Sequence, residues 1–143
     1  MEKEQWLLLA IAAGESEGLT PVQLQKSLFL LGKSLSKKVL GKSFYKFVPY
    51  NYGPFNVTIY SDAESLGRKG LVEIQHEGRR WPQYRVTAAG VRLARDVHNA
   101  LSEEVRSHLD AVVKWTQSKS FSGLLRAIYR EYPQYRQSSI FQG

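Results

Sequence analysis

The sequence predicts a mainly α-helical protein with a small β-hairpin, arranged as a winged helix-turn-helix with additional C-terminal helices. Apolar residues recur at helical spacing over most of the chain, and two short alternating segments flank Gly78 as in a hairpin. The predicted order is helix, helix, helix, hairpin, helix. We expect residues 1–100 to form the winged-helix domain. Residues 101–143 are expected to be a helical extension that packs on this domain or mediates dimerisation.

The first two helices are predicted at residues 3–13 and from Pro21 onward. The segment WLLLAIAAG follows a net acidic start and is short, which indicates a buried helix and not a secretion signal. No run approaches the roughly 18 apolar residues of a membrane span, so we expect no membrane association. Thr20 fits an N-cap, and Pro21 fits the first helical position.

Three lysines are predicted to share one face of the second helix. Lys26, Lys33 and Lys37 repeat at spacings of seven and four residues. At about 100° per residue this spacing places them opposite an apolar face, which is formed by Leu24, Leu28, Leu31 and Leu35. Two interpretations stay open, namely a solvated lysine face or a stripe that binds DNA phosphates.

A turn and a third helix follow. Residues 51–54, NYGP, are a strong turn signal, and Pro54 suits the start of the helix. Asn56 is a possible cap if the helix starts later. The expected buried face of the helix is Ile59, Ala63 and Leu66, and Gly70 is its expected C-cap.

The third helix is the expected recognition helix. A helix start that faces outward suits a phosphate, because free backbone N–H groups and the helix dipole attract anions. The candidate DNA contacts of this helix are Asn56, Thr58, Ser61, Arg68 and Lys69. Asp62 and Glu64 in the same helix weigh against DNA. The alternative is that the turn only packs Tyr52 and Phe55 into the core.

The hairpin is predicted from LVEIQ and WPQYRV, with a turn at Gly78 between them. Arg79 and Arg80 lie at its tip, where they are either solvated or in contact with DNA. We expect the lysine stripe and these arginines to form one basic surface. Trp81 is expected chiefly to pack.

Three further helices are predicted to start at Thr87, at Ser102, and at Ser120 or Ser122. The last has an apolar face beyond the needs of a minimal winged helix. Its candidate dimerisation residues are Phe121, Leu124, Leu125 and Ile128. The alternative is that this helix packs on the first helix of its own chain.

Composition narrows the function classes. Of 143 residues, 43% are hydrophobic, which is enough for a core. The chain has 20 Lys and Arg, 13 Asp and Glu and a net charge of +7, which favours an acidic partner. It has no Cys, which excludes disulfides and thiolate chemistry and fits the cytoplasm. The three histidines lack metal-ligand spacing and the acids are scattered, so we expect neither an enzyme, nor a cofactor, nor a metal site.

Two family resemblances add to this. Residues 56–95, which close on Tyr84, Val86, Thr87 and Gly90, resemble the wing region of MarR- and PadR-type winged-helix regulators. That resemblance implies binding to double-stranded DNA.

The second resemblance rests on LQKSLFLLG, NYGPF and LLRAIYREYPQY. Leu24, Gln25, Lys26 and Leu28, followed by Tyr52, Gly53 and Pro54, look like the Panacea (SocA-like) antitoxin domain. This resemblance implies that the chain binds a protein toxin. The sequence therefore predicts a winged-helix transcriptional regulator that forms a homodimer, with an antitoxin-like or adaptor protein-interaction module as the alternative.

Overall fold

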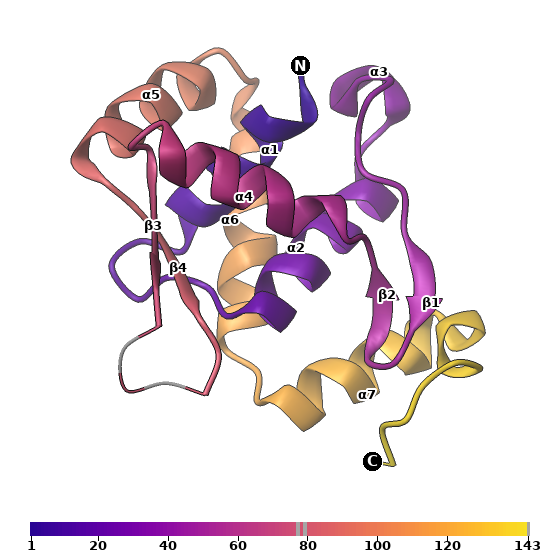
Figure 1. Ribbon diagram of the computed structural model, residues 1–143. Coiled ribbons are helices and arrows are strands. Elements are labelled where there is room, and N and C mark those ends of the chain that lie inside the picture. The colour runs from indigo at the N-terminus through magenta and orange to yellow at the C-terminus, as the bar shows by residue number, and fades with distance from the viewer. Residues whose placement is uncertain (77, 79, 143) are drawn as a thin grey trace.

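Figure 1 shows the computed structural model, which describes residues 1–76, 78 and 80–142. The chain begins with three helices, α1 Lys3–Ala13, α2 Pro21–Ser34 and α3 Lys37–Leu40. The hairpin of β1 Val48–Tyr50 and β2 Gly53–Phe55 follows, and then α4 Thr58–Arg68. A second hairpin consists of β3 Val72–Gln75 and β4 Gln83–Val86. The chain closes with α5 Ala88–Asn99, α6 Glu103–Gln117, α7 Phe121–Glu131 and the 3₁₀ helix η1 Pro133–Arg136. The expected mainly helical class with a small antiparallel hairpin is confirmed.

Both hairpins are antiparallel. In the β3–β4 hairpin Val72 pairs with Val86, and in the β1–β2 hairpin Pro49 pairs with Pro54. Of the two helix starts that the sequence left open, Pro54 is wrong, because the paired strand continues to Phe55. The later start is correct, since α4 begins at Thr58 and the Asn56 side chain accepts from the Thr58 N–H at 2.8 Å. Leu19 ties the β3–β4 hairpin to the chain before α2 through two backbone hydrogen bonds with Tyr84, of 2.8 and 2.9 Å.

The main core surrounds α1, whose residues 6–11 are all buried. This helix is enclosed because α2, α4, α5 and α6 all pack against it (Figure 1). The Trp6 indole N–H donates to the Leu40 carbonyl at 2.9 Å, so the largest core side chain leaves no polar atom unsatisfied. Leu109 and Val113 of α6 belong to the same core.

Polar side chains cap the helices as expected. Thr20, Thr87, Ser102 and Ser120 each accept a hydrogen bond from a backbone N–H in the first turn, at 3.0–3.2 Å. The open choice between Ser120 and Ser122 is thereby settled for Ser120. Within the described residues, no helix is long and apolar enough to cross a membrane.

Candidate functional site

Two of the three segments on which the expected antitoxin resemblance rests, residues 24–32 of α2 and the β1–β2 turn, meet in space. Gln25 of α2 binds the backbone of Asn56 twice: its amide donates to the Asn56 carbonyl at 2.8 Å, and its carbonyl accepts from the Asn56 N–H at 2.9 Å. The Lys26 ammonium donates to the Pro54 carbonyl at 3.0 Å. The two side chains therefore attach the β1–β2 hairpin to α2.

Lys26 is not part of an exposed basic stripe, and that expectation is wrong. Its residue exposure is 2%, because the β1–β2 hairpin covers this face of α2. Burial lowers the pKa of Lys26 from its ordinary value of 10.5 to about 7. Gly53 has a φ of 91°, a backbone conformation that favours glycine. It lies against the Lys26 side chain, because a Cβ built on Gly53 would be 3.5 Å from Cε of Lys26.

The start of α4 satisfies its polar groups internally. The Asn56 side chain accepts from the Thr58 N–H at 2.8 Å and donates to the Lys46 carbonyl at 2.6 Å. Ser61 donates to the Thr58 carbonyl at 3.0 Å. Asn56 is half-buried, while Thr58 and Ser61 are exposed. The expected packing of the turn is met in part, because Phe55 is half-buried whereas Tyr52 is exposed. Asn56 has its amide and carbonyl engaged within the chain.

The other α4 candidates, Arg68 and Lys69, are exposed at its C-terminal end, and Glu64 is exposed along the same helix. Asp62 is held inside the molecule instead. It accepts from the Tyr45 hydroxyl at 2.8 Å and lies 3.3 Å from the Lys3 ammonium. Burial and this carboxylate both raise the pKa of Tyr45.

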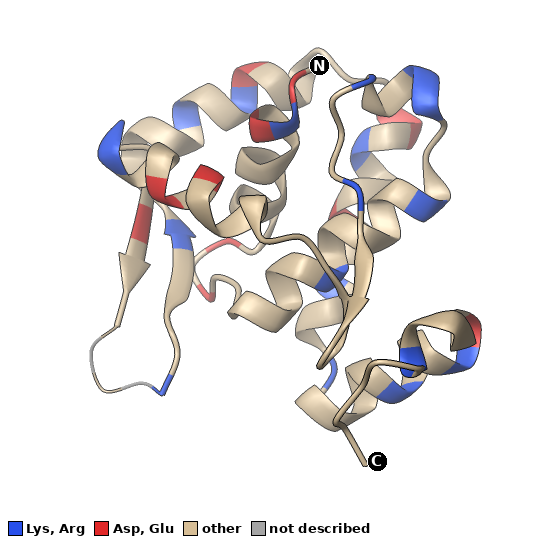
Figure 2. Cartoon of the chain, turned by 45° about the vertical axis from the view of Figure 1, so that its right-hand side comes forward, with Lys and Arg blue, Asp and Glu red and all other residues tan. Residues whose placement is uncertain are grey.

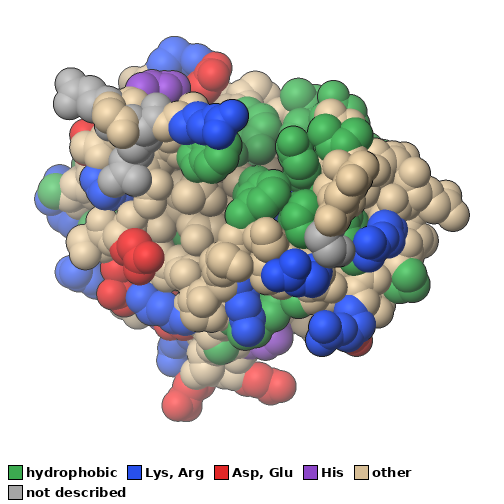
Figure 3. All heavy atoms as spheres, turned by 90° about the horizontal axis from the view of Figure 1, so that it is seen from below, with side chains coloured by type: hydrophobic (Ala, Val, Ile, Leu, Met, Phe, Trp, Pro, Cys, Tyr) green, Lys and Arg blue, Asp and Glu red, His purple; other side chains and the backbone are tan. Residues whose placement is uncertain are grey.

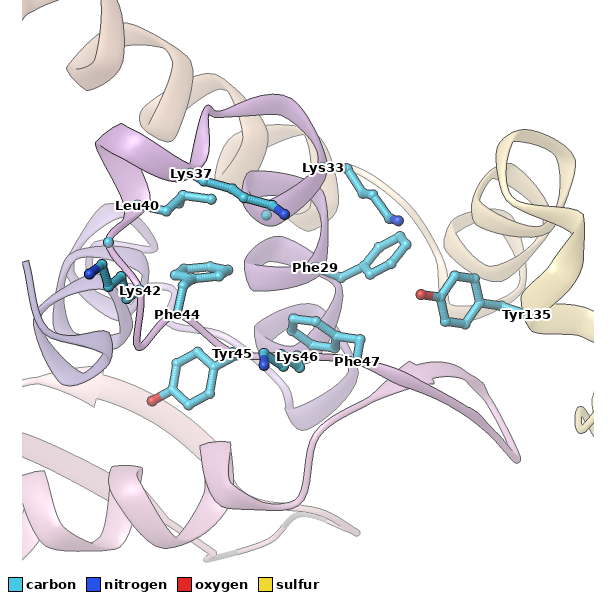
Figure 4. Close-up of a pocket in the computed structure, with 12 residues that line it drawn as sticks. Phe29, Lys33, Lys37, Leu40, Lys42, Phe44, Tyr45, Lys46, Phe47 and Tyr135 are labelled. Carbon is cyan, nitrogen blue, oxygen red and sulfur yellow. The ribbon is translucent and has the colours of Figure 1, made fainter.

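Lys33 is exposed near the end of α2, and Lys37 is exposed in α3. The expectation that Lys37 continues the second helix is wrong, because α2 ends at Ser34. With Lys42 and Lys46, these two lysines surround a cavity of about 530 Å³, here called the lysine pocket (Figure 4), whose other lining residues are Phe29, Gly32, Leu40, Gly41, Phe44, Tyr45, Phe47 and Tyr135. In Figures 1 and 2, α3 and the β3–β4 hairpin lie at opposite ends of the molecule. The expectation of one basic surface joining the lysines to the hairpin is therefore wrong.

The apolar face of α7 is covered by its own chain. Leu124, Leu125 and Ile128 are at most 1% exposed and pack with Phe29 and Tyr135 in a second hydrophobic cluster. They are therefore not available for dimerisation, and that expectation is wrong. The residues that cover them come from α2 and η1, and not from α1 as the alternative supposed. Self-association of the protein stays a prediction, and it would need other residues than these three.

Phe121, at the start of α7, is exposed and lines a second cavity of about 580 Å³. We call it the aromatic groove. Its lining residues are Thr20, Pro21, Val22, Gln23, Tyr52, Arg80, Trp81, Lys119, Ser120, Phe121 and Leu124. They come from the starts of α2 and α7, the β1–β2 turn and the chain before β4. Figure 3 shows the molecule from below, with hydrophobic side chains gathered on this face.

The three aromatic rings of the groove are partly solvent-exposed, by 50% for Trp81, 42% for Tyr52 and 39% for Phe121. Tyr52 and Phe121 meet edge to face at 5.4 Å between ring centres. The Arg80 guanidinium lies 5.6 Å from the Trp81 ring centre. Arg80 and Lys119 are the charged side chains of the lining, which includes no Asp or Glu. Arg79 lies outside the described residues.

Sequence reasoning missed this groove. It assigns Trp81 chiefly to packing and Phe121 to a dimer face, and it gives packing of Tyr52 as one of two alternatives. The sequence does contain a hint of the groove, namely three large aromatic residues that lie near predicted turns in separate segments. Aromatic residues are enriched in binding surfaces. Among the described residues, no three His, Asp or Glu side chains gather as a metal site would require. No known family model matches the chain, and no curated protein is significantly similar to it.

Proposed function

We propose that this protein is an interaction module that binds a partner protein through the aromatic groove. The observation that carries the proposal is the half-exposure of Trp81, Tyr52 and Phe121 around one cavity. A folded chain ordinarily covers such side chains, and contiguous exposed apolar surface is typical of protein-binding sites. Trp and Tyr are also the side chains that dominate binding energy at interfaces.

The charges of the groove favour an acidic partner segment. Arg80 and Lys119 border the apolar lining, and no acidic side chain in the lining neutralises them. A peptide segment with a large apolar side chain between Asp or Glu residues would fill the groove and pair with both cations. The resemblance to the Panacea antitoxin domain implies a toxin as the partner protein.

The test is a selection of displayed random peptides on the wild-type protein. The proposal predicts enrichment of aromatic or leucine residues flanked by Asp or Glu. Selected peptides should lose about tenfold or more in affinity for Trp81→Ala, because removal of an interface Trp often costs at least about 2 kcal/mol. Enrichment of basic peptides, or equal affinity for both proteins, would reject the groove as the binding site.

A second candidate function is binding to double-stranded DNA, with a role in transcription regulation. One observation favours it: α4 packs against β3, so the exposed Thr58, Ser61, Arg68 and Lys69 belong to the same part of the fold as the hairpin that carries Arg80. Glu64 and Glu73 are exposed there too, which reduces the attraction for phosphates. We rank this candidate second for that reason.

Fluorescence anisotropy with a labelled duplex at several salt concentrations separates the two candidates. A DNA-binding protein would lose affinity steeply with salt, and Arg79→Ala with Arg80→Ala would reduce the slope of log affinity against log salt by roughly one or more. Absence of salt-sensitive binding in the wild type would remove the DNA candidate and leave the protein partner.

A further inference from the structure

The lysine pocket combines four cations with an aromatic floor. Lys33 and Lys37 reach it from α2 and α3, and Lys42 and Lys46 reach it from the segment between α3 and β1. Figure 4 shows Lys33 and Lys37 on one side of the rings and Lys46 on the other. Two elements and a loop thus bring together basic residues that the sequence spreads over fourteen positions, from 33 to 46.

These cations have no acidic partner. All four lysines are exposed, and within the described part of the chain none of them takes part in an ion pair. The lining includes no Asp or Glu. The carboxylate of Asp62 lies behind Tyr45, and the Lys3 ammonium at 3.3 Å already pairs with it. Four ammonium groups around one cavity therefore attract an anion of high charge.

The floor of the pocket is aromatic. Phe44 and Tyr45 meet at 5.8 Å between ring centres, and Phe29 meets Phe47 at 5.5 Å, in both cases edge to face. Phe47 is the least covered of these rings. Phe29, Phe44 and Tyr45 are at most 9% exposed, so the half-buried Phe47 is the ring on which a flat aromatic group would stack.

We propose that the lysine pocket binds a nucleoside polyphosphate, with the phosphates at the lysines and the base against the aromatic floor. The cavity volume of about 530 Å³ lies in the usual range for small-molecule sites. This inference does not depend on the proposed protein partner, because the aromatic groove and the lysine pocket share no lining residue.

The experiment is isothermal titration calorimetry with ATP, ADP, AMP, adenosine and pyrophosphate at about 0.1 M salt, where surface charges are screened beyond about 10 Å. Affinity should increase with the number of phosphates, and ATP should bind more tightly than pyrophosphate. Lys33→Ala with Lys37→Ala should weaken ATP about 100-fold, because each charged hydrogen bond contributes about tenfold or more.

Lys38→Ala with Lys69→Ala is the matched control. It removes the same charge from exposed lysines outside the pocket lining, one of them in α3 itself. It should change ATP affinity by less than about threefold, because neither side chain lines the pocket to donate a charged hydrogen bond to a phosphate. Phe47→Ala should weaken ATP but not pyrophosphate, with the fold checked by circular dichroism. The proposal is overturned by an equal loss in the control, by adenosine or pyrophosphate binding as tightly as ATP, or by the absence of saturable ATP binding.

Discussion

Two neighbouring regions differ in the exposure of their side chains. One is the junction where α2 meets the β1–β2 turn, and the other is the aromatic groove. At the junction, Gln25 and Lys26 are buried, and each has a hydrogen-bond partner inside the chain. In the groove, Tyr52 and Trp81 are left about half exposed. The difference teaches that the polar side chains of α2 that bind the turn hold the fold together, whereas the aromatic side chains beside them stay exposed to solvent.

The largest expected effect concerns α7, which the structure places with the buried regions. Leu125→Ala should lower the free energy of unfolding by about 2–5 kcal/mol, because its side chain is fully buried and its removal leaves a cavity. Urea denaturation measures this change. If the variant keeps its stability but light scattering shows a monomer where the wild type is a dimer, α7 is a dimer face and this account of α7 is wrong.

The next effect concerns the buried lysine. The pKa of Lys26 is about 7 in the folded chain and about 10.5 when exposed, so between these values the unfolded chain binds more protons. The free energy of unfolding should therefore rise by a few kcal/mol as the pH increases from about 7 to about 10. Lys26→Met should abolish this slope, as measured by denaturation at several pH values.

Ionisation of tyrosines limits the pH range in which the Lys26 effect can be measured. Burial raises the pKa of Tyr84 to about 12 and raises that of Tyr60 as well, so stability should decline above about pH 10 as unfolded tyrosines ionise. A wild-type slope between pH 7 and 9.5 that equals the slope of Lys26→Met would show that this lysine is accessible to water.

A smaller loss is expected at Gln25. Gln25→Leu removes both hydrogen bonds to the Asn56 backbone and should lower the free energy of unfolding by about 2–3 kcal/mol, since two partly buried groups lose their partner. Gln23→Leu is the comparison variant, because the Gln23 side chain accepts one backbone hydrogen bond, from the Thr20 N–H at the helix start, where Gln25 makes two. If both variants lose the same free energy of unfolding, the hydrogen bonds of Gln25 to Asn56 do not stabilise the fold more than an ordinary helix cap.

The sequence predicted the longer helices, their serine and threonine caps and the β3–β4 hairpin, because apolar spacing and capping residues act within one element. It did not predict the break between α2 and α3. It did not predict which neighbour covers a given face. Lys26 and Lys33 both lie on α2, seven residues apart, yet the β1–β2 hairpin covers the first and leaves the second exposed. The aromatic groove was missed for the same reason, since four separated segments form it and no local pattern specifies their meeting.

Two tyrosines of the same hairpin provide the most direct test of the protein-binding claim. Tyr52 lines the aromatic groove, whereas Tyr50 does not and stacks on Phe55 instead, at 4.9 Å between ring centres. Both are exposed, so either truncation should change the free energy of unfolding by less than about 1 kcal/mol.

The decisive measurement is the affinity of a selected acidic, aromatic peptide for Tyr52→Ala and for Tyr50→Ala. The account predicts that Tyr52→Ala weakens binding by about tenfold, while Tyr50→Ala stays within about twofold of the wild type. Equal affinities of the two variants, or a larger loss in Tyr50→Ala, would contradict binding through the aromatic groove.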